Sequence, residues 1–296
     1  IHRYKNWSQE IKNIYDSYPD MRIVYTGSSI LELEKGGADL SRRKLEYKLA
    51  GLSFREYLKI AKNIDVPVHT MNDILSHKID FPYKEHHPIP LFKEYMHSGY
   101  YPFCTDYGYS IRINSIVNQI LENDIKDFSE MSVTTARALK KLMYIIAQSV
   151  PFKPNYSKIA KDIGINRQLV TDLFIYLEKA QLINILRDSS FGISSLGKIE
   201  KIYLNNTNLS YALAGEMIDV GNARETTFLS LVNPVYDITS SPNSDFIVDR
   251  KHTFEVGGRN KKQKQIQGIK NSFVVKDDIE YGSSNIIPLW SFGFLY

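Results

Sequence analysis

Apolar positions follow one another in different patterns along this chain, and each pattern predicts a different kind of structure. In residues 110–128, 134–149 and 167–180 they recur every three to four positions, which predicts helices. From residue 198 onward short apolar runs alternate with helical patterns, as is typical of an α/β domain. The whole chain is therefore predicted to be an α/β multidomain protein with a helical middle.

The first 60 residues predict a small α/β segment. Apolar residues at helical spacing in residues 7–18 indicate an amphipathic helix. Two short apolar runs, residues 23–25 and 45–49, have the length and composition of buried strands. A second helix is expected to open at Ser53, because Glu56 stands three residues later and completes a capping box.

A helix-turn-helix pattern stands in the middle of the chain. Residues 156–163 predict a short helix, Gly164 supplies a left-handed turn residue, and Asn166 caps the following helix. Residues 182–186 then predict a strand. This order is typical of a winged helix.

The second helix of this pattern has two interpretations. Arg167, Gln168 and Thr171 lie on its amino-terminal part, where a DNA-reading helix presents such side chains. Asp172 and Glu178 on the same helix favour the alternative, a packing or partner-binding module.

The stretch RIVYTGSSILELEKGGADLSRRKLEYKLAGLSFREYL, residues 22–58, resembles a known family. It is similar to AAA+ ATPases of bacteria and archaea that carry a C-terminal domain of unknown function with a restriction-endonuclease-like fold. The resemblance covers nearly the whole chain. It implies the back half of the ATPase core at residues 1–58, a helical lid at 59–130, a winged helix at 131–195 and a nuclease-like α/β domain at 196–296.

The resemblance also implies roles in ATP hydrolysis. Ser28, with Thr26 as the alternative, matches the side chain that senses the γ-phosphate, and Arg43 matches the arginine that stabilises the transferred phosphoryl group, with Arg42 beside it. The chain contains no G-x-x-x-x-G-K-[ST] motif. ATP and Mg²⁺ are therefore expected to bind in an intact protein of which this chain is a fragment, and the chain alone is expected to be inactive. A satisfied hydroxyl turn and two solvated arginines are the alternative.

Three acids of the C-terminal region stand in the order found in Mg²⁺-dependent nucleases: Glu225, Asp245 and Glu255. Such sites also need a lysine two residues after the last acid, but Gly257 stands there. A lysine of the following segment is a candidate replacement. These lysines are Lys261, Lys262 and Lys264. The alternative is that the three acids are ordinary surface residues.

A basic segment follows the predicted strands. Between Arg250 and Lys270 only Glu255 opposes the positive side chains. Such a segment attracts nucleic acid or another polyanion, unless it is simply a solvated face. The candidate nucleic-acid contacts are Arg167, Gln168, Arg259, Lys261, Lys262 and Lys264.

Composition narrows the functional classes. A single cysteine, Cys104, excludes an internal disulfide framework and favours the cytoplasm. No apolar run reaches the roughly 20 residues of a membrane helix. We expect an ATP-binding protein that couples ATP hydrolysis to domain movement on nucleic acid or protein. The alternatives are a non-catalytic DNA- or partner-binding module and a Mg²⁺-dependent nuclease, and assembly into a homo-oligomer is left open.

Overall fold

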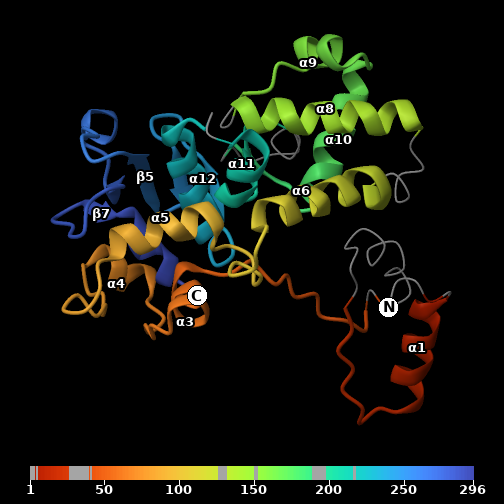
Figure 1. The fold of residues 1–296 in the computed structure, drawn as a ribbon, viewed down its shortest axis with the longest axis horizontal. Helices are drawn as coiled ribbons and strands as arrows, with labels where there is room; N and C mark the ends of the chain where they lie inside the picture. Colours follow the sequence, from red (N-terminus) through yellow and green to blue (C-terminus); the bar gives the residue numbers. More distant parts are fainter. Residues whose placement is uncertain are drawn as a thin grey trace. The chain divides into compact units, whose positions relative to one another are not determined.

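A computed structural model gives the structure of the protein (Figure 1). It describes residues 4, 6–26, 40, 42–125, 132–149, 153–188, 198–215 and 218–296. The chain forms two compact units that are described separately below. Unit 1 comprises Ile1–Leu49, Ser115–Leu142 and Tyr156–Leu182, and unit 2 comprises Ala50–Asn114, Met143–Asn155 and Ile183–Tyr296.

Unit 1 begins with the expected amphipathic helix, α1 (Trp7–Ser17). Its buried residues Trp7 and Ile11 form a small apolar cluster with Leu40, and Tyr25 packs against this cluster. The Trp7 and Tyr25 rings lie 5.5 Å apart. The apolar stripe of α1 thus holds the following segment against the helix.

The two predicted strands of the N-terminal segment were a wrong prediction. Residues 23–25 and 45–49 have no regular secondary structure, although Ile23 and Tyr25 are partly buried. Val24 is 97% exposed, and Leu45 and Leu49 also face solvent. A strand forms only where a neighbouring strand accepts and donates its backbone hydrogen bonds. Among the described residues no strand pairs with either segment.

The predicted helical middle is confirmed. Its helices are α6 (Tyr109–Gln119), which continues as a π-helical turn at Ile120–Asp124, and then α8 (Val133–Ser149), α9 (Tyr156–Ile163) and α10 (Arg167–Lys179). Gly164 has a φ of 77°, the left-handed conformation that lets the chain turn between α9 and α10. The Asn166 side chain accepts a hydrogen bond from the Leu169 amide and caps α10.

Helices cover a core of aromatic side chains in unit 2. They are α3 (Phe54–Lys62), α4 (Met71–Leu75), α5 (Pro88–Ser98), α11 (Thr207–Ala214) and α12 (Val220–Val232). The predicted capping box of α3 is confirmed, since Ser53 and Glu56 exchange hydrogen bonds. Helix α3 packs against α5 and against the 3₁₀ segment η5 (Leu289–Phe294). The division between units after Leu49 differs from the predicted boundary at 58, and α3 belongs to unit 2.

Unit 2 contains two sheets. Strands β1 (Ile183–Arg187) and β2 (Ile199–Leu204) pair antiparallel. A five-stranded sheet runs in chain order through β3 (Ile238–Ser240), β4 (Phe246–Val248), β5 (His252–Gly257), β6 (Ser272–Lys276) and β7 (Ile286–Pro288). The first three strands are antiparallel, and β5, β6 and β7 are parallel. Helix α12 lies against β5 (Figure 1). The buried Phe228 ring packs against Phe246, Phe254 and Phe292.

The run of Lys and Gln in residues 261–270 predicts a polar helix, and this prediction is wrong. This segment holds only a 3₁₀ turn, η4 (Lys264–Ile266). Gln267 is extended, and Gly268 has a φ of 82°, so the chain leaves the helical conformation after one turn. The turn returns the chain so that β6 can start beside the beginning of β5, in the register Thr253 to Ser272.

Candidate active site

The structure brings two of the three predicted acids, Glu225 and Asp245, together around a lysine. Glu225 lies on α12 and Asp245 directly precedes β4. The Lys201 Nζ lies 3.3 Å from Asp245 Oδ1 and 3.5 Å from Glu225 Oε2. Glu225 on a helix and Asp245 at the start of an inner strand therefore share the ammonium group of Lys201.

Pairing of β4 with β5 places the third acid near Asp245. Phe246 stands opposite Phe254, so the next positions outward are Asp245 and Glu255. The Asp245 amide donates to the Phe254 carbonyl, and the Val256 amide donates to Asp245 Oδ2 at 2.9 Å. These bonds fix the Asp245 carboxylate across the strand pair.

Glu255 is a buried carboxylate with one oxygen paired and one unpaired. The side chain is 1% exposed. Its Oε1 lies 2.5 Å from the Lys261 Nζ, whereas its Oε2 has no hydrogen-bond partner in the described part of the chain. Burial raises the pKa of Glu255, and the charge of Asp245 adds to this although Lys261 opposes it. Burial tends to lower the pKa of Lys261, but the bond to Glu255 leaves it raised.

Gly257 explains how Lys261 reaches this acid. A Cβ at position 257 would lie 2.6 Å from Lys261 Cδ, so any side chain there would take the place of the Lys261 stem. Of the three candidate lysines, Lys261 thus contacts Glu255 across the space left at Gly257. Lys262 and Lys264, the other two candidates, are exposed.

Sequence reasoning missed Lys201 and Tyr203. Both lie on β2, two residues apart and so on one face of the strand. The Tyr203 hydroxyl donates to Glu225 Oε2 at 2.8 Å. Burial, and then the charge of Glu225, raise the pKa of Tyr203. Burial, and then the charge of Asp245, raise the pKa of Glu225. The available signal was the charged pair Glu200 and Lys201 within a short strand whose other residues are Ile, Tyr and Leu.

The nuclease-like fold expected for this domain implies a divalent metal, which the site fits in chemistry. Carboxylate oxygens are the ligands that such an ion prefers, and the buried Glu255 Oε2 lacks a partner. In the described part of the chain, however, no three acidic, histidine or cysteine side chains are gathered so as to hold an ion. Lys201 stands between Glu225 and Asp245 instead. Metal ligation by the three acids stays a prediction.

The N-terminal candidates are only partly described. Ser28 lies outside the described residues. Arg43 is held by Asp16, with Nε 2.9 Å from Oδ1 and Nη2 3.3 Å from Oδ2. Arg42 and Thr26 are exposed. Asp16 therefore fixes the direction of the Arg43 guanidinium on the loop.

The nucleic-acid candidates lie at the surface. Arg167 and Gln168 are exposed in the first turn of α10. Arg259, Lys262 and Lys264 are also exposed, and Lys261 is half-buried at the acids.

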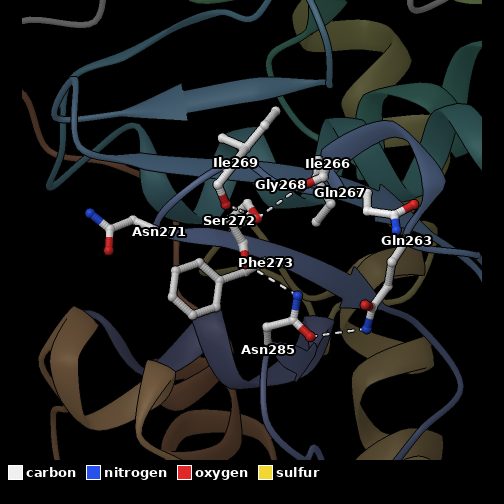
Figure 2. A pocket seen from close by; sticks show the side chains of 9 residues that line it. All are labelled: Gln263, Ile266, Gln267, Gly268, Ile269, Asn271, Ser272, Phe273 and Asn285. Atoms are coloured by element: carbon white, nitrogen blue, oxygen red, sulfur yellow. Dashed lines mark hydrogen bonds between the residues drawn. The ribbon is translucent and has the colours of Figure 1, made fainter.

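A pocket of about 480 Å³ opens beside this basic segment (Figure 2). Its wall includes the amides of Gln263 and Asn285, which are joined by a 2.9 Å hydrogen bond, and the Phe273 ring. Gln267 and Asn271 add further amide groups. The pocket does not include the three acids.

Comparison with known proteins finds separate family matches for the N-terminal part and for the middle of the chain. Residues 1–58 match the family described as AAA domain. This region is AAA-type and ATPase-like. Residues 89–218 match a domain of unknown function (DUF8612), a span that crosses the predicted domain boundaries at 130 and 195.

One curated relative is an uncharacterized protein of Methanocaldococcus jannaschii. It is 28% identical over 189 residues, which make up 60% of this chain and 39% of the relative. The chain thus spans well under half the length of that protein. No solved structure matches the chain. In the described part of the chain, no helix is long and apolar enough to cross a membrane.

Proposed function

We propose that this chain acts within an ATPase, in which ATP binding and hydrolysis move the C-terminal domains on a nucleic-acid or protein target. The match of residues 1–58 to AAA domains carries this proposal. The chain itself has no phosphate-binding P-loop motif, so the proposed site also needs a P-loop from an intact protein. ATP and Mg²⁺ bind there.

The exposed apolar segments of unit 1 support this arrangement. Val24, Leu45, Tyr47 and Leu49 are almost fully exposed, which is unusual for side chains in strand-like runs. In a complete ATPase core, residues 23–25 and 45–49 become strands beside partner strands from the P-loop half. Arg43 then stabilises negative charge on the transferred phosphoryl group.

Replacing Arg43 by alanine should lower kcat for ATP hydrolysis by the intact protein about 10- to 100-fold, the value of one charge-assisted hydrogen bond or slightly more. Arg42→Ala removes the same charge from the exposed neighbour and should have little effect. Asp16→Ala removes only the partner of Arg43 and should cost less than Arg43→Ala. Steady-state ATPase assays measure all three variants. Equal losses for Asp16→Ala and Arg43→Ala would reduce Arg43 to a structural role.

The second candidate function is Mg²⁺-dependent cleavage of nucleic acid by the C-terminal domain. The observation that favours it is the buried, unpartnered Glu255 Oε2 beside Asp245. The order of the strands adds support, since an antiparallel β3–β4–β5 meander followed by parallel β6 agrees with the expected restriction-endonuclease-like core. Glu225, Asp245 and Glu255 would hold the ion.

The side chains of this site have distinct tasks in that reaction. When bound, a divalent ion neutralises charge on the phosphate and makes water a better nucleophile. Asp245 is oriented by the Val256 amide, and Lys261 orients Glu255.

Nucleic acid is the favoured target of both functions. The α9–α10 pair followed by β1 and β2 has the element order of a winged helix, and its exposed Arg167 and Gln168 suit DNA contacts. Gln263, which lies between Lys262 and Lys264 in the sequence, lines the amide-rich pocket of Figure 2. Amide side chains offer the paired donors and acceptors that base edges use.

Glu255→Gln should reduce Mg²⁺- or Mn²⁺-dependent cleavage of DNA about 100-fold or more, because it removes a negatively charged ligand at nearly constant shape. Glu200→Gln, a charge-matched change on β2 outside the cluster, should retain cleavage. Gel assays on labelled single- and double-stranded DNA measure the rates. No cleavage by the wild-type protein with either metal, or equal cleavage by Glu255→Gln, would eliminate this function.

A further inference from the structure

We infer that Lys201 is an internal cation that occupies the acidic cluster in place of a divalent metal, so that strand β2 controls access of the metal to the site. This inference deepens the second proposed function and rests on it. It assigns to one lysine the regulation of a site formed by Glu225, Asp245 and Glu255.

The position of Lys201 carries the first step. Its Nζ contacts Asp245 Oδ1 at 3.3 Å and Glu225 Oε2 at 3.5 Å, and all three side chains are largely shielded from water. A divalent ion held by Glu225 and Asp245 together would compete with Lys201 for these two carboxylates. The ammonium and the metal therefore exclude each other.

The charges of the cluster carry the second step. Three carboxylates face two ammonium groups, because Lys261 is committed to Glu255 and Lys201 to the other two acids. One negative charge remains, and the buried Glu255 Oε2 is the oxygen without a partner. With Lys201 withdrawn, the cluster has two uncompensated charges and attracts a divalent cation more strongly.

The strand that bears Lys201 carries the third step. Tyr203, on the same face of β2, donates to Glu225 Oε2, the oxygen that Lys201 also contacts, so two side chains of β2 hold this acid. Strand β2 pairs along its length with β1, and Asp188 just beyond β1 bridges to Ser240 of β3. A shift of β2 would move Lys201 out of the cluster. By linkage, metal binding and the position of β2 must then affect each other equally.

The experiment compares Lys201→Met with Lys198→Met in the full chain. Lys198 pairs with Glu200, and the second variant removes the same charge near the same strand at an exposed position outside the cluster. Mn²⁺ affinity is measured by isothermal titration calorimetry, and thermal unfolding is measured without metal and with saturating Mn²⁺.

Lys201→Met should bind Mn²⁺ about 5- to 150-fold more tightly than the wild type, the usual range of coupling between competing states. Without metal its Tm should fall by several degrees, and Mn²⁺ should restore more of this loss than it adds to the wild type. Lys198→Met should behave as the wild type in both measurements. Glu225→Gln combined with Lys201→Met should recover part of the lost Tm, because it removes one uncompensated carboxylate.

Two results would overturn the inference. One is an unchanged or weaker Mn²⁺ affinity of Lys201→Met, and the other is a metal-free Tm no lower than that of Lys198→Met. The first result together with wild-type cleavage that depends on Glu255 rejects only the role of Lys201. If the wild type does not cleave DNA but Lys201→Met still binds Mn²⁺ more tightly, only the nuclease function is rejected.

Discussion

Replacing Phe54 by alanine should lower the free energy of unfolding of unit 2 by about 3–5 kcal/mol, the usual cost of deleting a buried aromatic ring. Phe54 is 0% exposed. Its ring lies 5.7 Å from Phe294 in a nearly parallel stack and 5.1 Å from Phe92 in an edge contact. The backbone of η5 approaches it closely, since a Cβ on Gly293 would lie 2.3 Å from Phe54 Cβ. A rigid backbone on this side cannot collapse into the cavity.

Ile60→Ala serves as the control for this prediction. Ile60 lies on the same helix but is 58% exposed, so its truncation should change the unfolding free energy by less than about 1 kcal/mol. Urea unfolding followed by circular dichroism and by aromatic fluorescence measures both variants. If Phe54→Ala shifted the unfolding midpoint no more than Ile60→Ala, α3 would not be anchored to the C-terminal core.

The prediction of secondary structure for the first 60 residues was only partly correct, and helix α3 shows why. The capping box of α3 is a local signal and was read correctly from Ser53 and Glu56. The strands at 23–25 and 45–49 depend on partners, and their apolar residues do not reveal whether a partner strand is present. Local signals predict helices such as α9 and α10 well for the same reason, because Gly164 and Asn166 act within a few residues.

The acidic site could be predicted in part for a similar reason. The order of Glu225, Asp245 and Glu255 was visible in the sequence, and the structure brings Lys261 to Glu255 across the space left by Gly257. The contact of Lys201 with Asp245 could not be foreseen, because it joins residues 44 positions apart through the packing of β2. Contacts between residues so far apart in the sequence depend on the tertiary fold, and no recognisable spacing of residues in the sequence marks them.

Lys261→Met should destabilise the folded protein by about 3–5 kcal/mol near and above neutral pH, the cost of leaving one member of a buried ion pair alone. Glu255 is then a buried carboxylate without a counter-ion, and its already raised pKa should rise further. A carboxyl group whose pKa is higher in the folded state binds its proton more tightly when folded. Its stabilising contribution is therefore present at low pH and is lost as the pH rises from the ordinary carboxyl pKa through the folded value.

The pH dependence makes this prediction specific. The stability difference between wild type and Lys261→Met should be small in acid, grow with rising pH and level off above the folded pKa of Glu255. Lys262→Met removes an equal charge from an exposed neighbour and should show no such growth. The double variant Glu255→Gln with Lys261→Met should regain much of the loss, because no buried charge remains. Urea unfolding at a series of pH values measures the stability of each variant. If the loss of stability in Lys261→Met stayed constant with pH, Lys261 would contribute only packing over Gly257 and would not compensate the charge of Glu255.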